Sequence, residues 1–546
     1  MVELTGVTGA PSSEPPLGDG IPGVAPVREE AGAVAGLVRA AGINSLGNVA
    51  SRALGLVRES VIAGIFGASG ATSAFDAVSG VPKMVYELLI GGMLSAALVP
   101  VLSEYAGADR RELDEALSTL LSLAVVVLLA VVLVLELAAP WIAPLLVGGF
   151  DAELLATATV LARIIVPAIL IYGFSGILQA YHYARRRFVY PAIGAPAHNL
   201  GVIMAVVLLA GKLNIASLSV GILVASVCQL LVQLPGLRGA RLRVRLHWRH
   251  PVVRRILSLY APVVLSIVVQ NVGIVIDRNL ASRTVNEAIT WMTKATFLVQ
   301  LPLGLVSMAI SLAVLPVLSQ IDAALDLHRF KRTFSRGLRL VLVVIVPATA
   351  LLFSLGPAII RLIFQRGEFT PEDAVQTWRA LRLYLIGLPF AAIDLPLVFA
   401  FYAQKDTVTP VVVGIVAVLV YLVVGPTLAF LAGWGFLGLV LANSVQLAGH
   451  AVIMLICFKR RFDGLRGYGM VSTSLKALVA SLPVALGGWL VRALVEPRLG
   501  GFIGDLLVVG LALVVGAVAY LAAARLLVME ELDLLWENLR HRLGSA

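Results

Sequence analysis

The chain has 546 residues, of which 59% are hydrophobic and 14% are charged, and its net charge is +10. Soluble domains carry about 25% charged residues, so this composition excludes an ordinary soluble protein and indicates a polytopic membrane protein. The excess of basic residues does not indicate nucleic-acid binding, because these residues gather in short loops between apolar runs. The two cysteines lie inside apolar runs, which favours neither a disulfide framework nor a metal site.

The first 35 residues contain five prolines and five acidic residues. They lack the basic segment followed by an apolar segment that defines a signal peptide. Their composition predicts a disordered cytoplasmic tail.

Apolar runs of about 20 residues predict about fourteen membrane-spanning helices. The expected spans cover residues 38–66, 71–101, 116–139, 154–182, 189–210, 214–235, 255–281, 286–317, 337–356, 374–402, 408–431, 436–458, 472–495 and 503–528. Alternate loops are rich in arginine and lysine, and this bias predicts that both termini lie in the cytoplasm. The predicted fold class is an all-α polytopic membrane protein.

An internal repeat divides these spans. LVPVLSEY (98–105) matches AVLPVLSQ (313–320), and YARRRFVYP (183–191) matches YAQKDTVTP (402–410). A third match, LELAAPWIAPLLVGGF with LFSLGPAIIRLIFQRGEF, lies between them, and the offset drifts only from 216 to 219 residues. Six spans separate matching positions, so the two halves share one orientation, as in transporters built from parallel repeats.

The repeat predicts two six-helix lobes with two additional C-terminal helices. The apolar spacing after the last span also predicts a short amphipathic surface helix. The expected units are a tail (1–35), an N-lobe (38–235), a basic cytoplasmic linker (236–254), a C-lobe (255–458), two further spans (472–528) and an amphipathic tail (529–546).

Charged residues interrupt the first two spans. An ionisable group at membrane depth costs about 2.5–3.5 kcal/mol on insertion scales, so it usually faces a bundle interior or a wet cavity. Asp76, Lys83 and Glu87 follow one another at seven and four positions, which predicts one helical stripe with Lys83 and Glu87 as a direct pair. The charged residues expected to line the cavity are Arg52, Arg58, Glu59, Asp76, Lys83 and Glu87.

These charges also have a structural interpretation. Arg52 and Arg58 are expected either to contact substrate or a gate, or to form a structural ion pair with Glu59 or Glu87. Lys83 and Glu87 fit a functional role and a simple intrahelical pair equally well.

Further charges lie in the second half. Lys294 is an intramembrane cation with no acid nearby in the sequence, which favours a functional role. Asp277 and Arg278 end the seventh span, where a gate and a solvated helix end would look alike. Asp394 is an acid among apolar residues of the tenth span and is a candidate ion-coupling site.

The sequence carries no signature of an enzyme. It has no phosphate-binding GxxxxGK[ST] loop and no His/Cys cluster with metal-ligand spacing, so we expect neither ATP hydrolysis nor a cofactor. Energy would then come from an ion gradient, mass action or the membrane potential, which is worth about 2.3 kcal/mol per charge per 100 mV. The pattern does not specify a coupling ion.

The segments SRALGLVRESVIAGIFGASGATSAFDA, LVPVLSEY, FQRGEF and FYAQKDTVTP resemble the MurJ (MviN) family of lipid II flippases. This family belongs to the multidrug/oligosaccharidyl-lipid/polysaccharide exporter superfamily, and the resemblance runs from Asn48 to Arg461. It implies a monomer in the bacterial cell membrane, with two lobes around a cationic cavity and a groove for the lipid tail. The implied partners are membrane lipids and a cargo of lipid II or a related undecaprenyl-pyrophosphate-linked glycan.

The resemblance also suggests site residues. Ser51, Arg52, Arg58 and Glu59 match the family's first-helix motif, whose arginines are expected to meet the diphosphate or hold the gate. Guanidinium groups suit this task, because they bind phosphate oxygens in pairs. The pair Asp277-Arg278 matches a seventh-helix pattern of the family.

The chain departs from the family pattern in two helices. Well-known members carry two arginines in the second helix where this chain has Tyr86 and Glu87. An Asp-Arg pair expected in the eighth helix is Thr296-Phe297 here, and Lys83 and Lys294 are candidate substitutes.

Three hypotheses follow. The first is lipid II transport by alternating access, with Arg52, Arg58 and Lys294 on the pyrophosphate. The second keeps the fold and changes the cargo to another polyprenyl-linked glycan or anionic lipid, and the missing arginines favour it. The third is a non-transporting membrane scaffold, which a cavity neutral after pairing would support.

Overall fold

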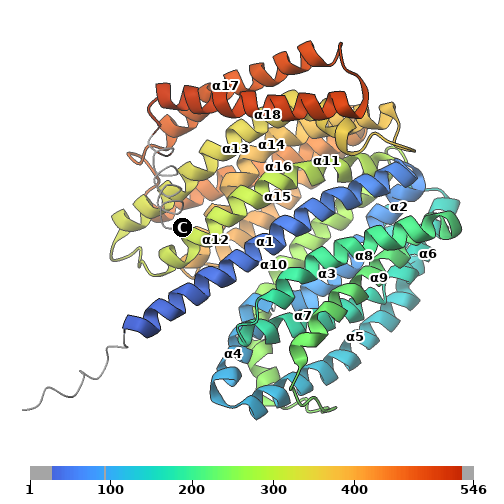
Figure 1. Ribbon diagram of the computed structural model, residues 1–546, viewed down its shortest axis with the longest axis vertical. Coiled ribbons are helices and arrows are strands. Elements are labelled where there is room, and N and C mark those ends of the chain that lie inside the picture. Colours follow the sequence, from blue (N-terminus) through green and yellow to red (C-terminus); the bar gives the residue numbers. More distant parts are fainter. Residues whose placement is uncertain (1–26, 92–93, 530, 532–546) are drawn as a thin grey trace, which may run out of the picture.

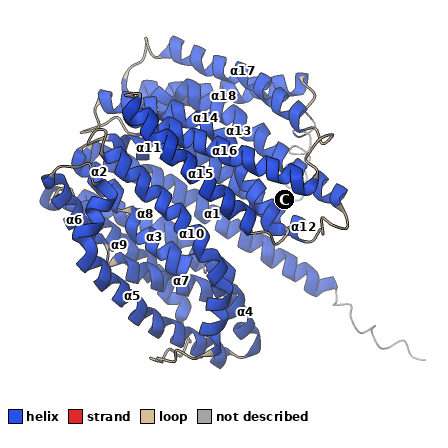
Figure 2. Cartoon of the chain, turned by 180° about the vertical axis from the view of Figure 1, so that it is seen from behind, coloured by secondary structure: helices blue, strands red, loops and turns tan. Residues whose placement is uncertain are grey.

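The computed structural model describes residues 27–91, 94–529 and 531. Within these residues every regular element is a helix and none is a strand (Figure 2). The first helix begins at Val27, inside the predicted tail, while residues 1–26 lie outside the described part of the chain. The predicted amphipathic tail at 529–546 lies almost entirely outside it as well.

The N-terminal half folds into consecutive helices. Short π-helical turns, called wide turns below, and one 3-10 turn are labelled η. The elements are α1 (Val27–Phe66), α2 (Gly70–Val78), α3 (Gly80–Tyr86), η1 (Glu87–Gly91), η2 (Leu94–Leu98), α4 (Val99–Ala108), α5 (Arg110–Val147), α6 (Ala152–Ile165), α7 (Ala168–Ala184), α8 (Val189–Leu213), α9 (Ala216–Gln233) and η3 (Leu234–Leu237).

The C-terminal half repeats this order and adds two helices. They are α10 (Pro251–Ser282), α11 (Ala288–Pro302), η4 (Leu303–Ser307), α12 (Met308–Ser319), α13 (Leu327–Ile363), α14 (Pro371–Ala403), α15 (Val408–Pro426), η5 (Thr427–Leu431), α16 (Phe436–Phe462), α17 (Met470–Val495) and α18 (Gly501–Leu526).

Eleven helical segments of the described residues are long and apolar enough to cross a membrane. The other three expected spans are also helical, since they coincide with α1, with the segment from α2 to α4, and with α10. Helices suit this environment because they satisfy their own backbone hydrogen bonds in lipid. The protein is therefore an all-helical multi-pass membrane protein, and the number fourteen stays a prediction.

The positions of the helices repeat as the sequence matches predict. Helix α1 ends at Phe66 and α10 ends at Ser282, 216 positions later. Helix α8 begins at Val189 and α15 at Val408, 219 positions later. The wide turn η1 at Glu87–Gly91 also recurs 216 positions later, as η4 at Leu303–Ser307. Such π turns are rare and occur frequently at functional sites, so their duplication marks equivalent positions in the two lobes.

The two lobes lie on either side of α1 (Figure 1). Helices α3 to α9 form one bundle and α11 to α16 form the other, while α17 and α18 pack outside the second bundle against α13. One apolar core includes buried residues of α1, α2, α5 and α6 together with residues of α11, α13 and α14. The two lobes are therefore in contact through a shared core where α1 ends.

The linker between the lobes is bound to the N-lobe. Between turns at 238–239 and 248–249, its residues 240–247 have no regular secondary structure, and alternate backbone N–H groups donate to side chains four residues apart on α5. Alternate residues of an extended chain are about 6.6 Å apart and residues four apart on a helix about 6 Å, so the two repeats match. The three bonds are Arg241 N to Asp114 Oδ2 (2.9 Å), Arg243 N to Ser118 Oγ (3.1 Å) and Arg245 N to Ser122 Oγ (2.9 Å).

Candidate functional site

Charges from the two lobes meet at α1 and α11. The carboxylate of Glu59 on α1 lies between two cations, 2.6 Å from Lys294 Nζ on α11 and 2.7 Å from Arg58 Nη2. The side chain of Lys294 is 0% exposed. We call Arg58, Glu59 and Lys294 the inter-lobe cluster. Burial of charges at this depth requires mutual pairing, and here the pairing joins the N-lobe to the C-lobe.

Helix α8 fixes the orientation of Arg58. Its Nη1 donates to Asn199 Oδ1 at 2.9 Å. The amide nitrogen of Asn199 in turn donates to the backbone oxygen of Ser51 at 2.9 Å and to its hydroxyl at 3.2 Å. Ser51 therefore acts on Arg58 through Asn199, a residue that sequence reasoning did not select.

Arg52 differs from Arg58 in having no ion-pair partner among the described residues. Its guanidinium lies against Gly304 in the wide turn η4, so closely that a Cβ atom at position 304 would stand 2.1 Å from Arg52 Nη2. Only glycine leaves this space open. Arg52 thus reaches from α1 to the C-lobe and keeps its positive charge unneutralised.

Asp76 adds a second carboxylate close to the inter-lobe cluster. It is near enough to Lys294 and Glu59 for their charges to interact, and its Oδ2 is buried without a hydrogen-bond partner in the described part of the chain. With Asp76 included, two cations face two carboxylates. Lys294 has no acid nearby in the sequence, but the fold pairs it with Glu59, which is 235 positions away.

The predicted pair of Lys83 and Glu87 is not formed among the described residues. The carboxylate of Glu87 turns toward Gly91 inside η1, where a Cβ atom would stand 2.5 Å from its Oε2. Lys83 is exposed and lies on the side of α3 that faces α8, close enough to His198 for their charges to interact. Because Arg58 also interacts with His198, Lys83 and Arg58 share one region of the N-lobe.

Asp277 and Arg278 bind α10 to its neighbours in the C-lobe. Tyr421 on α15 donates its hydroxyl hydrogen to Asp277 Oδ1. Arg278 Nη1 donates to Thr293 Oγ1 on α11 at 2.9 Å. Both side chains have protein partners within one lobe.

Asp394 on α14 has a partner that sequence reasoning missed. His450 Nδ1 on α16 lies 2.7 Å from Asp394 Oδ1, and the two side chains are 14% and 18% exposed. A carboxylate and an imidazole in contact can hold a proton between them, and no feature of the sequence links two residues 56 positions apart.

The two lobes are held together around the end of α1 by contacts between small groups. The Ser60 hydroxyl donates to the Ile363 backbone oxygen at 2.6 Å, and the Ser73 and Thr290 hydroxyl oxygens are 3.1 Å apart. The Glu368 N–H donates to the Gly64 oxygen at 3.0 Å. The backbones approach this closely because Gly67 and Gly367 carry no side chain and adopt φ values of +60° and +53°. Sequence reasoning used the GIFG and FQRGEF segments without recognising them as contact partners.

This geometry can now be compared with known proteins. The family model described as "Lipid II flippase MurJ" matches residues 62–510 of the chain. The chain belongs to the MurJ family.

Relatives within the MurJ family match most of the chain. "Lipid II flippase MurJ" of Burkholderia cenocepacia is 29% identical over 426 residues, which are 75% of this chain and 81% of that protein. "Probable lipid II flippase MurJ" of Vibrio cholerae is 31% identical over 412 residues, 72% of this chain and 78% of that protein.

Solved structures support the fold of this MurJ family member. "Lipid II flippase MurJ, inward closed conformation" matches with a TM-score of 0.74 and 23% identity, over 88% of this chain and 98% of that chain. An inward-facing multidrug resistance MATE transporter of the MOP superfamily matches with a TM-score of 0.67 and 12% identity, over 76% of this chain and 95% of that one. Both matches support the fold of this chain.

Proposed function

We propose that this MurJ family member flips lipid II from the cytoplasmic to the outer leaflet of the bacterial cell membrane by alternating access of its two lobes. The observation that carries the proposal is the family match, which extends over both lobes and into α18. The basic loops support an orientation with both termini in the cytoplasm, and the end of α1 then faces outward. The protein would act as a monomer and a transporter, without a catalytic step.

The unpaired cations suit a diphosphate. Arg52 and Lys83 have no ion-pair partner among the described residues. Arg52 lies against Gly304 of the C-lobe, and Lys83 lies, like Arg58, close to His198. A guanidinium binds two phosphate oxygens at once, and a lysine adds a point charge. We assign first contact with the pyrophosphate to Arg52 and Lys83 rather than to Lys294, which is fully buried here.

The inter-lobe cluster suits a gate. A bound diphosphate would compete with Glu59 for Arg58, and this competition would weaken the link from Glu59 to Lys294. A ligand shifts a conformational equilibrium only by binding one state more tightly, and the competition provides that difference. Loss of the link would let the lobes separate at the end of α1.

We make a separate proposal for the energy source of transport. The pair of Asp394 and His450 lies in the C-lobe between α14 and α16, and we propose that it couples transport to an ion by binding a proton or cation. The membrane potential would act in addition on cations that move with the lobes.

A second cargo is favoured by one observation. Tyr86 and Glu87 stand where the family pattern has two arginines, and the Glu87 carboxylate lies inside η1. Fewer cations would suit a polyprenyl-linked glycan or anionic lipid with less charge than lipid II.

Complementation tests the cargo. A strain depleted of its lipid II flippase would receive the wild-type chain, Arg52→Ala or Arg58→Ala, with exposure of lipid II on the outer leaflet as the readout. Rescue by wild type and loss in either variant are expected. Arg498→Ala is the matched control, because Arg498 is exposed in the turn after α17 and its side chain donates to the backbone oxygen of Leu494. Failure of well-expressed wild type to rescue would reject lipid II as cargo.

Cross-linking tests alternating access independently of the cargo's identity. Ser73→Cys and Thr290→Cys would be introduced after both native cysteines are replaced by alanine. The native hydroxyl oxygens are 3.1 Å apart, so oxidation should form a disulfide that holds the lobes together. Transport should stop on oxidation and return on reduction. Transport that continues in the fully oxidised protein would contradict opening at this end.

A further inference from the structure

A basic cavity lies between α13 and α17, on the side of the C-lobe away from α1. Its volume is about 410 Å³. Arg332, Arg336 and Arg339 line it from the first turns of α13, and Lys476 lines it from α17. Together with one carboxylate, Glu531, the cavity therefore gathers four cations and a single anion.

Glu531 neutralises one of these cations and holds it in place. Its carboxylate lies 3.1 Å from Arg339 Nη1 and accepts a hydrogen bond from Thr473 Oγ1 at 2.7 Å. Glu531 is only 4% exposed, so this contact forms the floor of the cavity. It also shows that an oxygen anion fits between α13 and α17.

The other cations are available to a ligand. Arg332 and Arg336 are exposed, and within the described residues neither has an ion-pair partner. Lys476 donates to the backbone oxygen of Val528 at 2.9 Å, which leaves its charge unneutralised. Three positive charges therefore remain after Glu531 and Arg339 have paired.

The N-terminus of α17 adds to the positive potential in the cavity. The helix has 26 residues, and its N-cap Gly469 provides no side chain to bond the first amide groups. Free amides and the helix dipole attract anions at such an end. Gly469 adopts φ +76°, and the Arg339 guanidinium occupies the space beside it, so the cation and the helix end face the same place.

The position of the cavity in the chain indicates which kind of anion it binds. The first turns of α13 are themselves one of the basic segments that predict the cytoplasmic side, where basic residues meet lipid headgroups. We propose that this cavity binds the phosphate of an anionic lipid in the cytoplasmic leaflet. The site is separate from the inter-lobe cluster and does not depend on lipid II as the cargo.

Lipid binding to the purified full-length chain tests the proposal. Affinity for phosphatidylglycerol would be measured in phosphatidylcholine nanodiscs that contain no lipid II. Loss of one charged contact with the lipid phosphate should weaken binding about fivefold, so Arg332→Ala/Arg336→Ala should bind about 30-fold more weakly. The matched control is Lys459→Ala/Arg460→Ala, because these residues are exposed at the end of α16, outside the cavity, and carry the same charge. It should change affinity less than twofold.

Two further arms separate the alternatives. Arg332→Lys/Arg336→Lys keeps both charges and should bind within about fivefold of wild type. Lysine variants that bind as weakly as the alanine variants would assign the loss to altered structure and overturn the proposal. Equal binding by wild type and the alanine variant would overturn it as well. Displacement of the lipid by millimolar inorganic phosphate would show a site for soluble anions and reject the lipid.

Discussion

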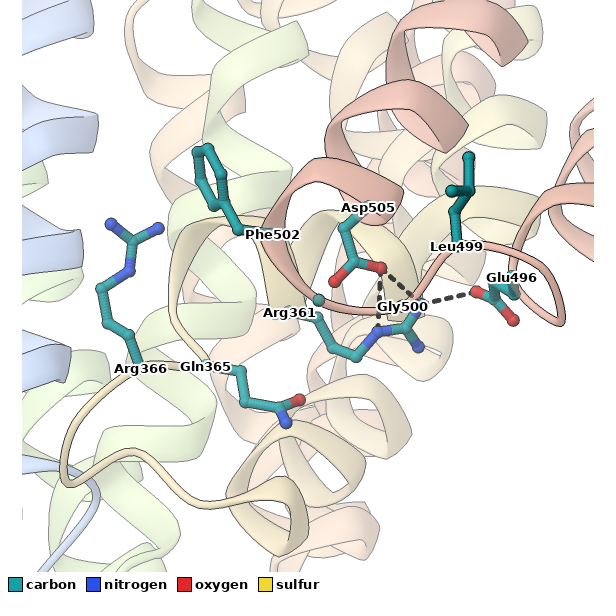
Figure 3. Close-up of a pocket in the computed structure, with 9 residues that line it drawn as sticks. Arg361, Gln365, Arg366, Glu496, Leu499, Gly500, Phe502 and Asp505 are labelled. Atoms are coloured by element: carbon teal, nitrogen blue, oxygen red, sulfur yellow. Dashed lines mark hydrogen bonds and ion pairs between the residues drawn. The ribbon is translucent and has the colours of Figure 1, made fainter.

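Two clusters of three charges join parts of this protein, and they have opposite composition. The inter-lobe cluster places one carboxylate, Glu59, between two cations. In the C-lobe, Arg361 near the end of α13 lies between two carboxylates, 2.5 Å from Glu496 and 2.7 Å from Asp505 (Figure 3). The second cluster ties the α17–α18 pair to the C-lobe, and we call it the hairpin cluster.

The two clusters differ more in solvent exposure than in the lengths of their ion pairs. Lys294 and Glu59 are 0% and 11% exposed, whereas Arg361 and Glu496 are 30% and 31% exposed beside a cavity of about 490 Å³. A buried pair contributes little net stability when intact, but removal of one partner leaves a charge that nothing compensates. A more exposed pair loses less stability when one partner is removed, because water replaces the missing group. We therefore expect the inter-lobe cluster to open and close during transport, and the hairpin cluster to stay closed.

Glu59→Gln should have the largest effect. It leaves Lys294 buried opposite a neutral amide, and loss of one partner of a buried pair costs about 3–5 kcal/mol. We expect a lower melting temperature in detergent and loss of transport in the complementation assay. The double variant Glu59→Gln/Lys294→Met should regain part of the stability, because the buried Lys294 charge is removed while Asp76 and Arg58 keep theirs. A double variant less stable than Glu59→Gln would contradict this account.

Arg361→Gln should have a smaller and more local effect. Hydrogen bonds to charged groups contribute about 1.5–3 kcal/mol, and here Glu496 and Asp505 regain water when the guanidinium is removed. Faster hydrogen exchange is expected for the α17–α18 connection, with the inter-lobe contacts unchanged. Arg498→Gln is the control, since Arg498 is exposed and its side chain donates to the backbone oxygen of Leu494 in α17. Equal destabilisation by Glu59→Gln and Arg361→Gln would remove the distinction between the clusters.

A higher salt concentration should affect the two clusters differently, without any mutation. The Debye length falls from about 8 Å at 0.15 M to about 3 Å at 1 M, and buried pairs are screened much less than wet ones. Hydrogen exchange near Glu496 and Asp505 should therefore rise with salt more than exchange near Glu59. A parallel rise at both places would show that the inter-lobe cluster is also wet.

Gly304→Ala should have the smallest effect on stability. The new methyl group would meet only the end of the Arg52 side chain, which is flexible and can move away. We expect a change of less than about 1 kcal/mol in the free energy of unfolding, with transport reduced because Arg52 has moved. Gly414→Ala is the matched control, since its nearest atom is His450 Nε2 at 4.0 Å. Full transport by Gly304→Ala would remove Arg52 from the cargo path.

The sequence predicted the helices better than it predicted the site. Apolar runs locate spans because length and hydropathy are local properties, and the repeat appears because the two halves keep similar order. The link between Glu59 and Lys294 joins residues 235 positions apart, and no local pattern encodes such a pair. The same holds for Arg361 with Glu496 and Asp505, which were not selected at all.

The wide turns show a further limit of prediction from helical spacing. Helical spacing correctly predicts that Lys83 and Glu87 belong to one helical region, and the backbone N–H of Glu87 does bond to the Lys83 oxygen. The direction of the Glu87 side chain depends instead on η1 and on the space above Gly91. A recurring Gly or Ser at the end of a duplicated turn, as in Gly91 and Ser307, is the signal that could have indicated it.

The connection between the lobes has a consequence for protein engineering. By its length, exposure and composition, the segment 238–250 is the natural place to insert a tag or a fluorescent domain. Its alternate amides, however, are bound to Asp114, Ser118 and Ser122 on α5, and one added residue would turn every second amide away from its acceptor. An insertion of two residues preserves this phase. The connector therefore tolerates change in even steps only, and odd insertions should detach it from the N-lobe.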